Sequence, residues 1–127
     1  MQERIEGPPL LVKVSDSRLD GNSAWFVKER VVELIREGHQ WIALEISKVE
    51  FIDSKGLATF VSIAQLLDGN GALVISGARG SVISMLKLTR LDKVFRMFAD
   101  EKQAIAALQS LRVKDPTQPK LGSGGET

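Results

Sequence analysis

The feature that most constrains the fold is a strand–helix–strand pattern in the middle of the chain. Two short apolar runs, 41–46 and 72–76, have the composition of strands that are covered on both faces. The apolar residues between them recur at helical spacing and are Leu57, Phe60, Val61, Ala64 and Leu67. Such a βαβ unit crosses over right-handedly and makes its two strands parallel. The pattern therefore predicts an α/β domain.

Further elements are predicted on both sides of this unit. They are a strand over 10–14, a helix over 23–37 capped by Asn22 or Ser23 and ended by Gly38, a helix over 81–88, a short edge strand within 94–98, and a last helix opened by an Asp100–Gln103 capping box. We expect a mixed sheet of four or five strands packed by about four helices. The domain should cover 9–112, between a flexible N-terminus (1–8) and a disordered C-terminal tail (113–127).

Composition excludes several classes of function. A chain of 127 residues, 43% of them hydrophobic, suits one compact domain. It has no cysteine, which fits a reducing compartment, and no run near the ~20 apolar residues that span a bilayer. The charged first residues lack the apolar core of a signal peptide, so we expect none. We expect a cytoplasmic protein without a membrane role. The net charge of +1 provides no general attraction to nucleic acid.

The most informative short segment is 49–60, where a strand leads into a helix. Asp53 and Ser54 both stand where a side-chain oxygen can cap the first turn. If Asp53 is the cap, the Ser54 hydroxyl is left to face outward. Gly56 adds a second clue, because glycine in a first turn costs roughly 0.5–1 kcal/mol relative to alanine. We infer that some group approaches the backbone closely at Gly56.

Catalytic interpretations of this segment lack the partners that they need. Asp53 as a phosphate acceptor requires a metal held by further acids, and the neighbouring loops offer only Asp16 and Asp20. Serine hydrolysis requires a base, but His39 is the single histidine and should lie on the opposite edge of the sheet. With one histidine and no cysteine, a metal site is also unsupported. We predict no enzyme activity, no cofactor and no metal.

A second glycine-containing loop follows the strand 72–76. Its backbone N–H groups at Gly77, Gly80 and Ser81, with the charge of Arg79, are a possible anion-binding site. The alternative is an ordinary tight turn, because the spacing matches neither a dinucleotide-binding nor a phosphate-binding loop sequence.

From about residue 10 to 111 the chain resembles the STAS domain of bacterial anti-sigma factor antagonists. The matching stretches are SRLDGNSA, ALEISKVEFIDSKGLATF, ALVISG, LKLTRLDKVFRMF and DEKQAIAAL. The family has D-S-x-G within the second stretch and uses that serine as a phosphate acceptor, which here is Ser54. Two features depart from the family: Lys55 stands where a small residue is common, and the first edge strand is shortened.

The resemblance implies a protein-interaction switch. The unmodified protein would bind an anti-sigma factor that is also a serine kinase of the histidine-kinase-like ATPase type, through Asp20, Asn22, Asp53, Ser54, Lys55 and Gly56. Phosphorylation of Ser54 would release it, a phosphatase would reset it, and the availability of a sigma factor for transcription would follow. The alternative is an unphosphorylated STAS scaffold, or a nucleotide- or anion-binding subunit of a larger assembly.

Overall fold

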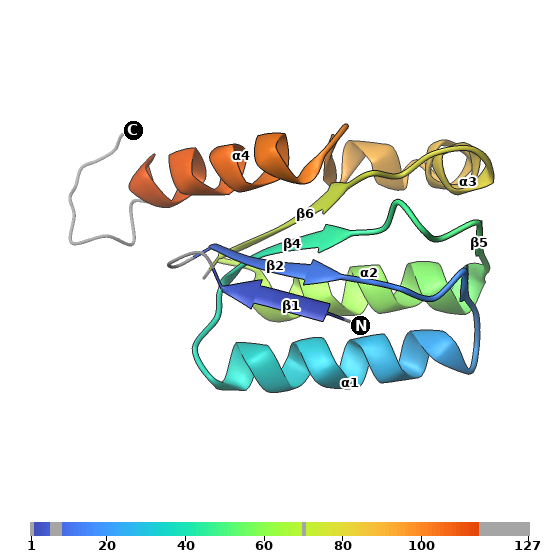
Figure 1. The fold of residues 1–127 in the computed structure, drawn as a ribbon, viewed down its shortest axis with the longest axis horizontal. Coiled ribbons are helices and arrows are strands. Elements are labelled where there is room, and N and C mark those ends of the chain that lie inside the picture. The colour runs from blue at the N-terminus through green and yellow to red at the C-terminus, as the bar shows by residue number, and fades with distance from the viewer. Residues whose placement is uncertain (1, 6–8, 70, 115–127) are drawn as a thin grey trace.

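The computed structural model describes residues 2–5, 9–69 and 71–114, and Figure 1 shows their arrangement. In chain order the elements are β1 (Gln2–Ile5), β2 (Pro9–Lys13), β3 (Arg18–Leu19), α1 (Ser23–Arg36), β4 (Trp41–Glu45), β5 (Phe51–Ile52), α2 (Ser54–Leu67), β6 (Ala72–Ser76), α3 (Ser81–Leu88), the 3-10 helix η1 (Leu91–Lys93), β7 (Arg96–Phe98) and α4 (Glu101–Lys114). None of the helices in the described ranges has the length and apolar character needed to cross a bilayer.

The main sheet has five strands in the order β1-β2-β4-β6-β7. β2, β4, β6 and β7 run parallel, and β1 pairs antiparallel with β2. Leu44 in β4 lies opposite Val12 in β2 and Ile75 in β6, which fixes the register of the three inner strands. The predicted α/β class, the mixed sheet and the parallel pairing of the two apolar strands are confirmed.

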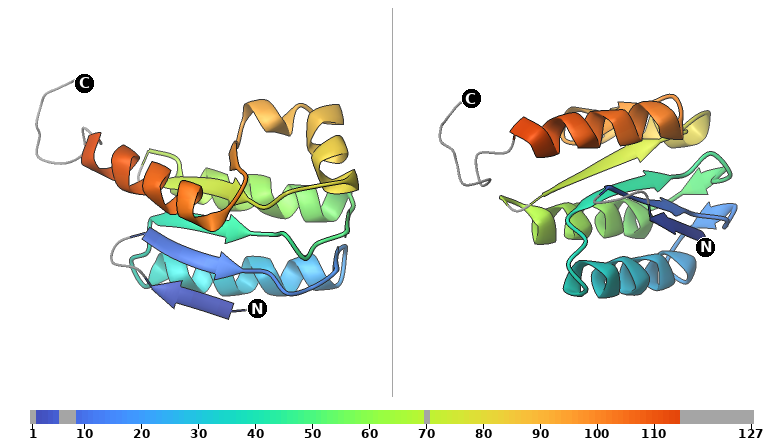
Figure 2. Two further views of the ribbon diagram at one scale, coloured as in Figure 1. Left: turned by 45° about the horizontal axis from the view of Figure 1, so that its top comes forward. Right: turned by 60° about the vertical axis from the view of Figure 1, so that its left-hand side comes forward.

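Helices cover both faces of this sheet, which explains why its inner strands are nearly all apolar. α1 and α2 lie side by side on one face and α4 lies on the other (Figures 1 and 2). Alternate residues along each strand point to opposite faces. The smaller core beneath α4 therefore takes Leu11, Ala43 and Val74, while the larger core takes their neighbours and the apolar side chains of α1, α2 and α3.

The N-terminal segment differs from the sequence prediction. Residues 2–5, predicted to be part of a flexible N-terminus, form β1, and the first edge strand is present. The physical reason is pairing, because β1 hydrogen-bonds along the edge of β2. This contact with another strand is not visible in the polar sequence of β1 itself. Of the predicted tail, 113 and 114 continue α4 and 115–127 lie outside the described residues.

Candidate functional site

A second, very small sheet brings two helix N-termini together. β3 pairs in parallel with β5, and the Asp53 N–H donates to the Leu19 carbonyl at 3.2 Å. Because β3 leads into α1 and β5 leads into α2, the starts of both helices lie at the same end of the molecule (Figure 1). This places the six residues predicted as a partner surface in the loop before α1 and at the start of α2. We call them the rim: Asp20, Asn22, Asp53, Ser54, Lys55 and Gly56.

Asp53, and not Ser54, caps α2. Its Oδ1 atom accepts from the backbone N–H of Lys55 at 2.9 Å and of Gly56 at 3.0 Å. Ser54 is the first residue of the helix and is exposed. Within the described ranges its hydroxyl makes no hydrogen bond. Of the two arrangements that the sequence left open, the structure has the one in which the serine hydroxyl is available to solvent.

Gly56 is required by the packing of β3 against the first turn of α2. A Cβ atom at this position would fall inside van der Waals contact with the Leu19 carbonyl oxygen and would lie 2.6 Å from Cγ1 of Ile52. The close approach inferred from the sequence is therefore confirmed, and the approaching group belongs to the chain's own backbone. Glycine here lets the β3–β5 sheet lie against the start of α2.

Asp20 holds the loop of the rim before α1. Its Oδ1 atom accepts from the backbone N–H of Asn22 at 3.0 Å and of Ser23 at 3.3 Å. The hydrogen bonds from the Ser23 and Asn22 N–H groups lower the pKa of this carboxyl. Asn22 occupies the N-cap position of α1, but its side chain makes no capping hydrogen bond. Asp20 therefore anchors this loop.

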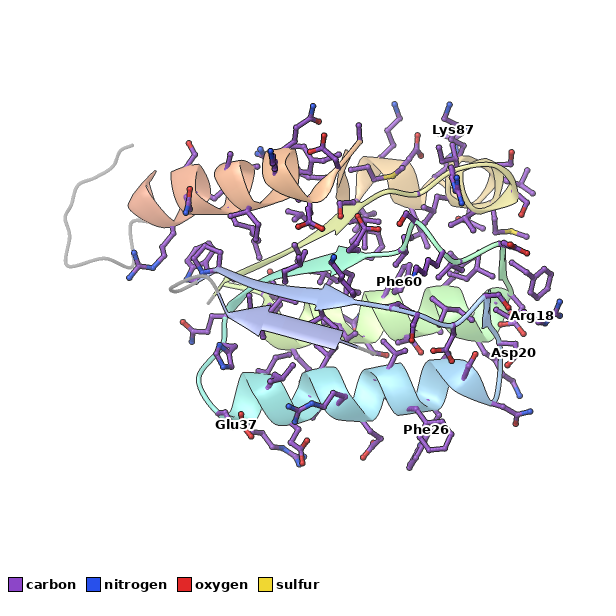
Figure 3. The ribbon with its side chains drawn as sticks, in the orientation of Figure 1. Arg18, Asp20, Phe26, Glu37, Phe60 and Lys87 are labelled. Atoms are coloured by element: carbon purple, nitrogen blue, oxygen red, sulfur yellow. The ribbon has the colours of Figure 1, made fainter. Side chains whose placement is uncertain are left out.

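Two further side chains at the rim carry no signal in the sequence. The Arg18 guanidinium lies over the Phe51 ring, 4.2 Å from its centroid, and Arg18 is paired with Phe51 across the β3–β5 sheet. Figure 3 shows Arg18 beside Asp20 at this end of the molecule. Each residue lies in a strand of two residues, which is too short to show a period-2 pattern. Sequence reasoning therefore missed both.

The loop predicted as a possible anion site has structural roles. Gly77 and Gly80 have positive φ values of 79° and 59°, a conformation that favours glycine. The Ser81 hydroxyl donates to the Glu50 carbonyl at 2.7 Å, which ties the start of α3 to the segment before β5. Arg79 is exposed. Anion binding by Gly77, Arg79, Gly80 and Ser81 stays a prediction.

A crevice of about 450 Å³ lies at the carboxyl ends of β2 and β4. The buried Glu45 forms part of its wall and is already engaged: Oε1 accepts from the Ser47 N–H at 2.6 Å and Oε2 accepts from the Ser76 hydroxyl at 3.0 Å. An ion pair between Lys13 and Glu101, 3.4 Å apart, lies at the same place. Throughout the described ranges, no group of three or more potential metal ligands occurs.

The cap assignment leads to a stability prediction. Asp53→Ala removes the acceptor of two backbone N–H groups, and we expect it to lower the free energy of unfolding by about 0.5–2 kcal/mol. Ser54→Ala removes no hydrogen bond and should change stability by less than about 0.5 kcal/mol. Urea unfolding of both variants measures the difference. A larger loss for Ser54→Ala than for Asp53→Ala would contradict the assignment.

Comparison with known proteins places this geometry in a family context. The family model described as "STAS domain" matches residues 2–104. Among solved structures, an anti-sigma factor antagonist from Mycobacterium paratuberculosis is 22% identical with a TM-score of 0.77, and the alignment covers 85% of this chain and 92% of that one. An anti-sigma-factor antagonist (STAS) domain protein from Planctomyces limnophilus is 13% identical with a TM-score of 0.78, over 85% and 97%.

A third similar structure is the Bacillus cell fate determinant SpoIIAA in its phosphorylated form. It is 16% identical with a TM-score of 0.66, and the alignment covers 84% of this chain and 96% of that one. At such low identities these three likenesses show a shared fold.

Proposed function

This chain belongs to the STAS domain family, and on that premise we propose that it is an anti-sigma factor antagonist controlled by phosphorylation of Ser54. The observation that carries the proposal is the division of roles between Asp53 and Ser54. Asp53 caps α2, so the neighbouring serine hydroxyl is exposed and has no structural hydrogen bond in the described ranges. Because the Ser54 hydroxyl makes no hydrogen bond within the described residues that stabilises the helix, it can be phosphorylated without unfolding α2.

In the unmodified state the rim binds an anti-sigma factor of the histidine-kinase-like ATPase type and displaces its sigma factor. The rim supports this role because the loop before α1 and the first turn of α2 present its exposed residues together at one end of the molecule. Asp20 holds the loop and Asp53 caps the helix, so little conformational freedom is lost on binding. The chain then regulates transcription through a partner and acts as a substrate, with no catalytic role of its own.

Phosphorylation reverses this interaction by electrostatics. The partner transfers the γ-phosphoryl group of its bound ATP to Ser54 Oγ, and a base on the partner accepts the hydroxyl proton. The phosphate adds a charge of about −1.5 to −2 at pH 7 beside the Asp53 carboxylate. Acidic groups and nucleotide phosphates across the interface then repel the rim, and the complex dissociates. A phosphatase that hydrolyses the phosphoserine restores binding.

Mass mapping after incubation with the anti-sigma kinase and ATP tests the proposal. We expect a single phosphate, located on Ser54, because this serine is exposed at a helix start and free of a structural hydrogen bond. Ser23 provides the matched comparison, since it also begins a helix but its hydroxyl donates to the Arg18 carbonyl. Stoichiometric phosphate on Ser23 or Thr59 with Ser54 unmodified would exclude the switch.

A further inference from the structure

The charged side chains of the rim and its neighbours divide into two sets by orientation. The Oδ1 atoms of Asp20 and Asp53 accept from backbone N–H groups, in the loop before α1 and in the first turn of α2. The cations extend outward: the Arg18 side chain is 61% exposed, against 30% for Asp20, and Lys55 is exposed. Of the four charged side chains of Arg18, Asp20, Asp53 and Lys55, the two cations are therefore the more exposed.

Arg18 is held in place before any partner arrives. Arg18 stacks on Phe51, and its Nε atom lies 3.6 Å from Oδ2 of Asp20. No other ion pair engages this guanidinium in the part of the chain that the structure describes, so its terminal nitrogens stay available. The Lys55 side chain lies across Gly21, where a Cβ atom would come within 3.1 Å of its Cδ atom.

We propose that Arg18 and Lys55 form a cationic edge that recognises a carboxylate on the anti-sigma partner, and that a phosphate on Ser54 competes for these same cations. This inference rests on the proposed function and deepens it. The partner surface would carry a carboxylate, and loss of its contact with the cations would contribute to release of the anti-sigma factor.

Charge and shape together favour a carboxylate as the partner group. The planar guanidinium forms two parallel hydrogen bonds with a carboxylate, and the lysine ammonium adds a point charge. Arginine and aromatic residues also dominate the energetics of protein interfaces, and the Arg18–Phe51 stack is partly exposed, with Phe51 at 37%. The cationic edge thus pairs an apolar contact with a charged one.

The position of Ser54 in the chain explains why its phosphate would compete with the partner carboxylate. Ser54 and Lys55 are both exposed in the first turn of α2, and Arg18 lies against Phe51 in the strand just before it, so a phosphate on Ser54 has both cations in its neighbourhood. Its charge of about −2 attracts them and repels a carboxylate that occupies the same place. Intramolecular capture of Lys55 by phosphoserine removes a contact that the partner needs.

The test is the affinity of the full-length chain for the purified anti-sigma factor, measured by calorimetry at low and high sodium chloride. We expect Lys55→Gln and Arg18→Gln each to weaken binding about fivefold and to reduce its salt dependence, because each removes one charge from the interface. Lys87→Gln is the matched control. Lys87 is exposed in α3, and Figure 3 shows it far from Arg18, so its loss should change the affinity by less than about twofold.

A double-mutant cycle tests the competition itself. If aspartate at position 54 acts partly by capturing Lys55, then Ser54→Asp should cost less affinity in the Lys55→Gln background than in the wild-type chain. Strictly additive losses would overturn the competition. Equal affinities for Lys55→Gln and Lys87→Gln would overturn the cationic edge while leaving the proposed function intact. Absence of binding by the wild-type chain would overturn both, and melting curves of each variant confirm that it is folded.

Discussion

Ser54→Asp is expected to weaken binding to the anti-sigma factor at least tenfold, or about 1.4 kcal/mol, while Ser54→Ala stays bound. The aspartate places a second negative charge directly beside Asp53, at the exposed start of α2. Its effect should be smaller than that of phosphoserine, because one carboxylate carries less charge and bulk than a phosphate. The alanine variant cannot accept a phosphate, so it should remain bound in the presence of ATP.

Calorimetry with the anti-sigma factor measures both affinities, and thermal melts recorded alongside separate binding from folding. Both variants should melt close to the wild-type chain, since Asp53 keeps the cap in each case. Equal affinities of the alanine and aspartate variants would show that charge at this position does not control binding. The phosphorylation switch would then be wrong, although the family assignment would stand.

The sequence predicted those parts of the fold that depend on local pattern. The strands β2, β4 and β6 and the helices α1 and α3 each have an apolar period or a buried composition, and their limits were predicted to within one residue. The capping box of α4 shows how local these signals are. The Gln103 N–H donates to Oδ1 of Asp100 at 2.9 Å, although the Gln103 side chain accepts from the N–H of Ala99 and not from that of Asp100.

What the sequence could not predict depends on contacts between distant segments. β3 and β5 have two residues each, and only their pairing with each other defines them as strands. The same pairing creates the Arg18–Phe51 stack, so that part of the candidate site was also missed. The choice between Asp53 and Ser54 as the cap stayed open for a related reason, because both residue types cap well and the backbone conformation decides between them.

Gly56 joins the fold to the candidate site, and Gly56→Ala is expected to destabilise the protein by about 1–3 kcal/mol. Two effects oppose each other in this substitution. Alanine favours the helical conformation by roughly 0.5–1 kcal/mol. The new methyl group, however, would press on the Leu19 carbonyl oxygen, which is a backbone atom of β3, and on the buried Ile52 side chain. We expect the steric effect to dominate because relief requires the backbone of β3 to move.

Gly21→Ala is the matched control for this prediction. A methyl group at Gly21 meets only the flexible end of the Lys55 side chain, with Cδ at 3.1 Å, so the cost should stay below about 0.5 kcal/mol. Urea unfolding compares the two variants. Movement of β3 also displaces Asp20 and its loop, so Gly56→Ala should bind the anti-sigma factor more weakly even at temperatures where it is fully folded. A Gly56→Ala variant more stable than wild type would show that helix propensity prevails and that β3 does not constrain the start of α2.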